Sequence, residues 1–139
     1  MPKLDVRLDS FLPYVLSVFR IVLGLLFTIR GTVKLLDWPI VAPVDIAIGS
    51  FPLWWAGVIE LVAGLLIMIG LVTRFAAFVA SGQMAFAYFM QHQPKSVWPV
   101  ENGGELAILF CFGFLLLVFA GGGVWALDSM RGSARKARK

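Results

Sequence analysis

Charged residues are scarce in this 139-residue chain, in which Asp, Glu, Lys and Arg together make up 14%. A soluble domain usually carries about 25% charged residues, whereas 60% of this chain is hydrophobic. The composition therefore excludes an ordinary soluble domain and indicates a membrane protein. The net charge of +4 does not indicate nucleic-acid binding, because the basic residues flank apolar runs or lie in the C-terminal tail.

Cysteine and histidine are nearly absent. Cys111 is the single cysteine, which excludes an internal disulfide and a CxxC redox pair, and its apolar surroundings indicate a packing role. His92 is the single histidine, so a bis-histidine haem site is excluded and a His/Met haem is the least favoured alternative. The nitrogen and sulfur ligands are too few for zinc, and we expect no metal site. Residues 1–10 have mixed charge and predict no signal peptide.

Four long apolar runs are the main feature of the sequence. They predict membrane spans at about residues 11–34, 52–72, 75–92 and 104–127. A span needs roughly 20 residues, and the third run is the shortest. Lipid cannot hydrogen-bond the backbone, so we expect all four to be helices. The sequence therefore predicts an all-α membrane protein, with residues 1–139 forming a single four-transmembrane-helix bundle.

The C-terminal tail sets the expected orientation. Residues 128–139 carry five basic side chains, which are Arg131, Arg135, Lys136, Arg138 and Lys139. The positive-inside rule places this tail, and with an even number of spans both termini, in the cytoplasm. The connections 31–51 and 92–104 then face outward. The tryptophans agree, because they fall at the expected interfaces: Trp38, Trp54, Trp55 and Trp98 outside and Trp125 inside.

Two helix stripes repeat the spacing 4, 3, 4, 3 and each combine a charge with a glycine. The first contains Arg20, Gly24, Phe27, Gly31 and Lys34, and the second contains Glu60, Gly64, Ile67, Leu71 and Arg74. Small residues let membrane helices approach closely. A rise of about 1.5 Å per residue puts Arg20 and Glu60 at similar depths, so we expect a buried ion pair between them. This pair would either hold two helices together or border a buried polar site.

The connection "MQHQPKSVWPVENGGE" (residues 90–105) gathers polar residues between apolar runs. A structural interpretation is that Asn102 and Glu105 form a capping box at the fourth helix, and that His92 caps the third. A functional interpretation places His92, Glu105 and Tyr88 at an outer mouth with Arg30 and Lys34. A histidine beside a carboxylate can relay protons near neutral pH, which suits the polar head of a quinone.

Five segments together resemble the DoxX family of small bacterial membrane proteins: "FRIVLGLLFTIRGTVKLL", "ELVAGLLIMIGLVTRFAA", "MAFAYFMQH", "ENGGELAILFCFGFLLL" and "GGGVWALD". The resemblance covers about residues 19–128. It implies a four-helix membrane bundle and an association with respiratory or sulfur redox chemistry, as in subunits of quinone-linked oxidoreductases. The matching polar positions are Arg20, Lys34, Glu60, Thr73, Arg74, His92, Asn102, Glu105 and Asp128. The family's WSLD-like ending is WALD here, with Ala126 in place of the serine.

The leading hypothesis is a membrane subunit that assists a quinone-linked redox complex in thiol, sulfur or oxidative-stress chemistry. His92 and Glu105 are its expected catalytic residues. The expected quinone-binding residues are Arg20, Lys34, Glu60, Tyr88 and Asn102, and electrons would come from a redox-active partner protein. One alternative is a non-catalytic membrane scaffold or assembly factor. Another is a small lipid or solute carrier, which would need a homo-oligomer. A ligand-sized groove favours the first hypothesis.

Overall fold

The computed structural model describes residues 2–136, which are helical wherever they form regular structure. The elements are α1 (Pro2–Leu36), α2 (Leu53–Ile69), α3 (Thr73–Ala87), the π-helical turn η1 (Tyr88–His92), α4 (Pro99–Asn102), α5 (Glu105–Ala120) and α6 (Leu127–Lys136). The all-α prediction is therefore confirmed for this part of the chain. Together, α3 and η1 match the third expected span closely.

The helix ends depart from the expected spans where glycine or polar sequence intervenes. α5 stops at Ala120 because Gly121 follows with a φ of 83°, a conformation that favours glycine. α4 and α6 were not expected, since neither is apolar and hydropathy does not signal them. α2 ends at Gly70, whose φ is 75° and whose backbone N–H bonds to Leu66 and Ile67. Arg74 therefore lies on α3 and does not continue the stripe of α2.

Three helices carry the apolar character of the fold. Within residues 2–136, the segment Val6–Leu36 of α1 has the length and apolar composition needed to cross a membrane. Leu53–Ile69 and Glu105–Ala120 are shorter apolar helices. Many large hydrophobic side chains remain exposed along them, including Phe112 and Phe119 of α5. A surface of this kind suits a lipid environment and supports the prediction that the chain is a membrane protein.

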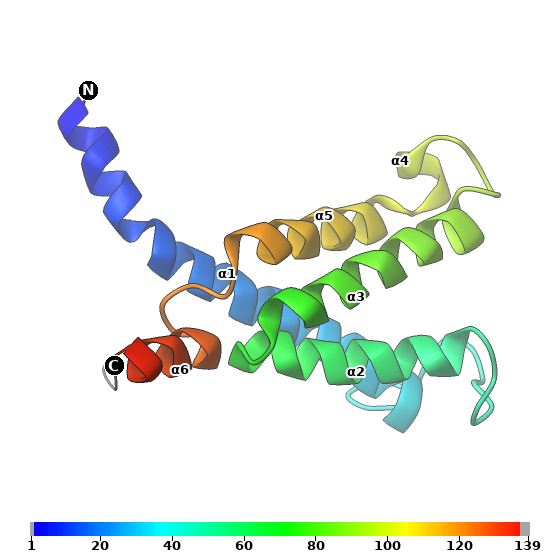
Figure 1. Cartoon of the computed structure of the whole chain (residues 1–139). Coiled ribbons are helices and arrows are strands. Elements are labelled where there is room, and N and C mark those ends of the chain that lie inside the picture. Colours follow the sequence, from blue (N-terminus) through cyan, green and yellow to red (C-terminus); the bar gives the residue numbers. More distant parts are fainter. Residues whose placement is uncertain (1, 137–139) are drawn as a thin grey trace.

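The helices pack in the order α1 on α2, α2 on α3 and α3 on α5 (Figure 1). The turn between α2 and α3, helix α6 and the start of α1 lie toward one end of the molecule, which we call the terminal end. The connection of residues 37–52 and the connection of residues 93–104 lie at the opposite end, which we call the loop end (Figure 1).

An aromatic cluster joins the helices at mid-height. Phe27 of α1 is fully buried, and its ring centroid lies 4.6 Å from that of Phe114 and 5.7 Å from that of Phe110. Ile67 of α2 and Met84 of α3 complete the same buried core. Burial of such side chains is worth about 1.5–3 kcal/mol each in water, although in lipid the close packing itself contributes most of the stability.

Glycine residues set the register of α1 on α2. A Cβ atom on Gly24 would lie 2.6 Å from the backbone nitrogen of Met68, so the two backbones are in direct contact there. Gly31 faces Leu61 and Gly57 in the same way. The close approach predicted from the two stripes is therefore confirmed.

The same register makes the predicted ion pair between Arg20 and Glu60 wrong. Arg20 lies beside Gly70 at the end of α2, and its Nε and Nη1 donate to the carbonyl oxygens of Gly122, Ile67 and Met68. Glu60 lies beside the last turns of α1 instead. The depth estimate failed because it counted residues from the predicted ends of the spans 11–34 and 52–72, whereas α1 begins at Pro2, far beyond the end of α2.

Candidate functional site

A buried carboxylate lies where the last turns of α1 meet α2 and α3. The side chain of Glu60 is fully buried, and its Oε1 accepts a hydrogen bond of 2.6 Å from Nζ of Lys34. The Nε of Arg30 lies 3.7 Å from the same oxygen, and Nε2 of Gln83 donates to it over 3.2 Å. Arg30 also lies over the ring of Phe110 at 5.7 Å. Two cations thus face one carboxylate, which leaves a local excess of positive charge.

Three polar atoms of this cluster are buried without a hydrogen-bond partner among the described residues. They are Oε2 of Glu60, Oε1 of Gln83 and Nε of Arg30. The amide of Gln83 has a defined orientation, because its Nε2 donates both to Glu60 and, over 3.4 Å, to the carbonyl oxygen of Ala56. An unpaired buried polar atom costs about 1–3 kcal/mol, so the arrangement is suited to a ligand that supplies the missing partners.

A cavity of about 280 Å³ opens beside these atoms, and we call it the Glu60 cavity. It is lined by Arg30, Lys34, Phe51, Pro52, Leu53, Trp55, Ala56, Ile59, Glu60, Gln83, Met84, Phe86, Ala87, Gln91 and His92. Most of these side chains are apolar, and a few convergent polar groups lie at the buried side. Phe51 and Phe86 approach edge to face, with ring centroids 6.3 Å apart. An apolar pocket with few polar groups is the usual form of a small-molecule site.

His92 reaches the cavity through the π-helical turn that ends α3. The wider turn of η1, in which the N–H of Gln93 bonds to the carbonyl of Tyr88, places both Gln91 and His92 in the lining. Such turns often occur at functional sites. Nδ1 of His92 lies 3.0 Å from the carbonyl oxygen of Asn102. A carbonyl only accepts, so Nδ1 carries the proton, and in the neutral ring Nε2 is an acceptor.

Tyr88 and Asn102 contact His92 but do not line the cavity. The rings of Tyr88 and His92 stack at 6.4 Å, and Nδ2 of Asn102 lies 3.5 Å from the hydroxyl of Tyr88. Asn102 is buried, and its Oδ1 accepts a hydrogen bond of 2.7 Å from the N–H of Gly104. Tyr88 and Asn102, two of the five residues predicted to bind the quinone, therefore contact the imidazole and do not line the cavity.

The predicted capping box is wrong. The N-cap of α5 is Gly104, and no side chain caps that helix, because Asn102 is already committed to closing the turn that precedes it. The predicted cap of α3 by His92 is also wrong, since its Nδ1 bonds to Asn102 instead. Glu105 is exposed and does not line the Glu60 cavity.

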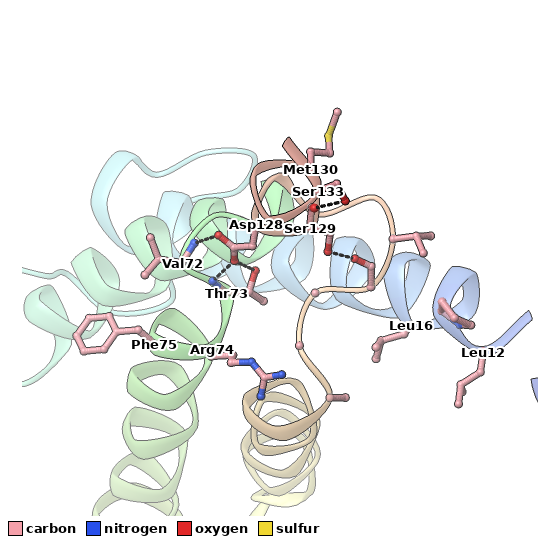
Figure 2. A pocket seen from close by; sticks show the side chains of 16 residues that line it. Leu12, Leu16, Val72, Thr73, Arg74, Phe75, Asp128, Ser129, Met130 and Ser133 are labelled. Carbon is pink, nitrogen blue, oxygen red and sulfur yellow. Dashed lines mark hydrogen bonds between the residues drawn. The ribbon is translucent and has the colours of Figure 1, made fainter. Parts of the chain in front are cut away.

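A second and larger groove, of about 1140 Å³, lies at the terminal end (Figure 2). Asp128 of α6 dominates its polar wall. Its carboxylate accepts hydrogen bonds from the N–H of Val72 over 2.9 Å, and from the N–H and hydroxyl of Thr73 over 2.8 Å each. Partial burial alone would raise the pKa of Asp128, but these bonds and the charge of Arg131 outweigh it and hold the pKa below the ordinary value. Asp128 thus caps the first turn of α3 from another helix.

The other hydrogen-bonding groups of this groove are also engaged in protein contacts. Ser129 donates to the carbonyl of Gly123 over 2.6 Å, and Ser133 donates to the carbonyl of Ser129 over 3.1 Å (Figure 2). Arg74 donates from Nη1 to the last carbonyls of α5, those of Val118 and Phe119. The groove is therefore a joint between helices, whereas the unpaired polar atoms lie in the Glu60 cavity.

The sequence-predicted residues fall into three groups. Lys34, Glu60 and His92 come together at the Glu60 cavity. Arg20 lies at the terminal end, and Glu105 lies outside the cavity. Gln83 was not among the predicted site residues, although an amide in a long apolar run was a usable signal, since polar groups inside a membrane need partners.

Comparison with known proteins decides the family. The DoxX family model matches residues 15–93. The chain belongs to the DoxX family. A relative from Haemophilus influenzae, described as an uncharacterized protein, is 44% identical over 127 residues, which is 88% of this chain and 95% of the relative. No solved structure matches the chain.

The resemblance noted from the sequence is thus confirmed. The matched residues include all the residues that line the Glu60 cavity. Residues 15–93 contain the polar lining residues Arg30, Lys34, Glu60, Gln83 and His92, but they end before Glu105. The DoxX match therefore includes the whole polar wall of the cavity.

Proposed function

We propose that this DoxX protein binds the head group of a quinone in the Glu60 cavity and assists a quinone-linked redox complex of the bacterial cytoplasmic membrane. The observation that carries the proposal is the fully buried Glu60, whose Oε2 has no partner within the described residues. A polar head beside an apolar tail suits a cavity with polar groups at its buried side and aromatic residues elsewhere in its lining.

The proposed topology has four spans with both termini in the cytoplasm. α3 and η1 run from Thr73 to His92 without a break, which is about 30 Å of helix at about 1.5 Å per residue. α2 and α5 are shorter, and a local thinning of the bilayer accommodates such helices. The basic residues of the C-terminal tail favour the cytoplasm for the terminal end. The Glu60 cavity then opens toward the outer leaflet.

In this proposal each polar residue has a distinct role. Lys34 and Arg30 face Oε1 of Glu60, and its free Oε2 accepts a hydrogen bond from the ligand head. Nε2 of His92 provides a further acceptor, held in place by Asn102. Glu105 has no role, because it does not line the cavity. Within residues 2–136 no cluster of three or more His, Cys, Asp and Glu side chains could hold a metal, so the electrons are assigned to a partner protein.

The test is mass spectrometry of the lipids that copurify with the protein in mild detergent. We expect near-stoichiometric quinone with the wild type and a loss of at least tenfold with Glu60→Gln or His92→Ala. Glu105→Gln is the matched control, since it makes the same chemical change at an exposed glutamate outside the cavity. Equal and negligible quinone in all four folded proteins would defeat the proposal.

A scaffold or assembly factor is the second candidate, and the terminal end favours it. Arg20, Arg74 and Asp128 all hold helix ends of this chain together, which is a structural role. The quinone measurement separates the two candidates. Absence of quinone, together with capture of the same partner protein by wild type and Glu60→Gln, would favour the scaffold.

A further inference from the structure

The unpaired atoms of the Glu60 cavity are mostly acceptors. Oε2 of Glu60 and Oε1 of Gln83 are both buried without a partner among the described residues, and Nε2 of a neutral His92 is an acceptor as well. Gln83 cannot exchange the two ends of its amide without penalty. Its Nε2 faces two acceptors, Oε1 of Glu60 and the carbonyl oxygen of Ala56, so a flipped amide would place oxygen against oxygen.

Hydrogen-bond donors are also present in the cavity, but a donor does not distinguish a ligand with carbonyl oxygens from a ligand with hydroxyl oxygens. The Nε of Arg30 is unpaired, and Lys34 uses one of its N–H groups on Glu60. Both can donate to a carbonyl or to a hydroxyl oxygen. The acceptors, by contrast, are satisfied only by a ligand that carries hydrogen on its polar atoms.

We propose that the Glu60 cavity selects the reduced quinol over the oxidised quinone, an inference that rests on the proposed quinone site. The head group of a quinone ends in two carbonyl oxygens, which only accept. The head group of a quinol ends in two hydroxyls, which donate to Oε2 of Glu60 and Oε1 of Gln83. A quinone in the same position leaves both buried acceptors unpaired and faces a carboxylate charge.

The expected preference is large enough to measure. A hydrogen bond to a charged group contributes about 1.5–3 kcal/mol, which corresponds to a preference of about tenfold to a hundredfold in affinity. Preferential binding of the reduced form also makes the bound quinone easier to reduce. A tenfold preference raises the two-electron midpoint potential of the bound couple by about 30 mV.

The experiment is a competition under anaerobic conditions in mild detergent. Purified wild-type protein is equilibrated with equal amounts of decylubiquinone and decylubiquinol, free ligand is removed, and the two retained forms are quantified by chromatography with electrochemical detection. The dimethyl ether of decylubiquinol serves as a third probe, because it keeps the shape of the quinol but lacks both hydroxyl donors. We expect retention of the quinol at least tenfold above that of the quinone and of the ether.

Variants link this preference to the two acceptors. Glu60→Gln removes the charged acceptor. Gln83→Met removes the neutral acceptor at similar volume, together with the hydrogen bond from Gln83 to Glu60, but keeps the carboxylate and its contact with Lys34. Each is expected to reduce the preference by about fivefold or more. Glu105→Gln and Gln93→Met make the same changes at exposed positions outside the cavity and are expected to leave it unchanged. If Glu60→Gln does not fold, Gln83→Met carries the test.

The outcomes separate this inference from the proposed function. Retention of the quinone as strong as that of the quinol, or of the ether as strong as that of the quinol, overturns the selectivity and leaves the quinone site intact. A quinol preference unchanged by Gln83→Met also overturns it. Failure to retain any of the three probes overturns the proposed function itself.

Discussion

Lys34, and not Arg20, is the principal counter-ion of Glu60: Nζ of Lys34 lies 2.6 Å from Oε1 of the carboxylate. The relationship follows from the register that Gly24 and Gly31 impose on α1 and α2. It brings the last turn of α1 beside the buried acid and leaves Arg20 about three turns of helix away, at the end of α2. The ion pair of Glu60 therefore depends on the last turn of α1.

Replacing Lys34 tests this dependence. Lys34→Met keeps the apolar part of the side chain and removes the ammonium group, so that Glu60 is buried with Arg30 as its nearest cation, 3.7 Å away. Breaking a buried pair in this way costs about 3–5 kcal/mol. We expect the free energy of unfolding, measured by SDS titration in mixed micelles, to fall by about 3 kcal/mol. Lys95→Met, at an exposed position of the loop end, is expected to have no effect.

A double-mutant cycle distinguishes the two possible partners of Glu60 directly. The cycle of Lys34→Met with Glu60→Gln is expected to give a coupling energy of about 1–3 kcal/mol, because the two groups share a hydrogen bond. The cycle of Arg20→Met with Glu60→Gln is expected to be additive within about 0.5 kcal/mol. Strong coupling in the second cycle and none in the first would contradict the observed register.

Much of the fold could be predicted from the sequence because apolar runs and glycine spacing act locally. Gly24 and Gly31 share a face with Phe27, and that face is the one that packs on α2. The relative shift of the two helices could not be predicted, since hydropathy does not show that α1 continues back to Pro2. Because of this shift, the predicted partner of Glu60 was Arg20, whereas its partner in the structure is Lys34.

The candidate site was predictable in part for the same reason. Glu60, Lys34 and His92 are unusual residues in apolar surroundings, and all three line the Glu60 cavity. The contribution of Gln83 depends on a contact between α2 and α3, which no spacing within one helix reveals. Glu105 was assigned from its nearness to His92 in sequence, yet the turn at Gly104 leaves it exposed.

Asp128 gives the stability of the protein a defined pH dependence. Its pKa in the folded state lies below the ordinary value, so its contribution is complete above the unfolded pKa of about 3.9 and is lost as the pH falls through the folded pKa. We expect the wild type to lose more stability than Asp128→Asn between about pH 4 and pH 2. Asp128→Ala, which removes the cap of α3, is expected to cost about 1 kcal/mol at neutral pH.

The control for this prediction is a second carboxylate with no helix to cap. Glu105→Gln changes an exposed acid for which the structure gives no hydrogen bond among the described residues. Its pH profile should follow that of the wild type. Parallel profiles for the wild type and Asp128→Asn would mean that the hydrogen bonds to Val72 and Thr73 do not depend on the charge of Asp128.

A pair of glycine substitutions separates packing between helices from helix propensity. Gly24→Ala places a Cβ atom 2.6 Å from the backbone nitrogen of Met68, whereas a Cβ atom on Gly82 of α3 meets nothing within 4 Å. Forcing α1 away from α2 is expected to cost about 1–3 kcal/mol. Gly82→Ala is expected to stabilise the protein by up to about 1 kcal/mol, since alanine favours the helix.

The same substitutions also report on the Glu60 cavity, because α1 supplies Arg30 and Lys34 to its lining. A shift of α1 lengthens the contact between Lys34 and Glu60, so Gly24→Ala is expected to retain less quinone than the wild type even where it remains folded. Gly82→Ala is expected to retain as much as the wild type. Equal stability and equal retention in both variants would show that the contact between α1 and α2 at Gly24 does not set the geometry of the site.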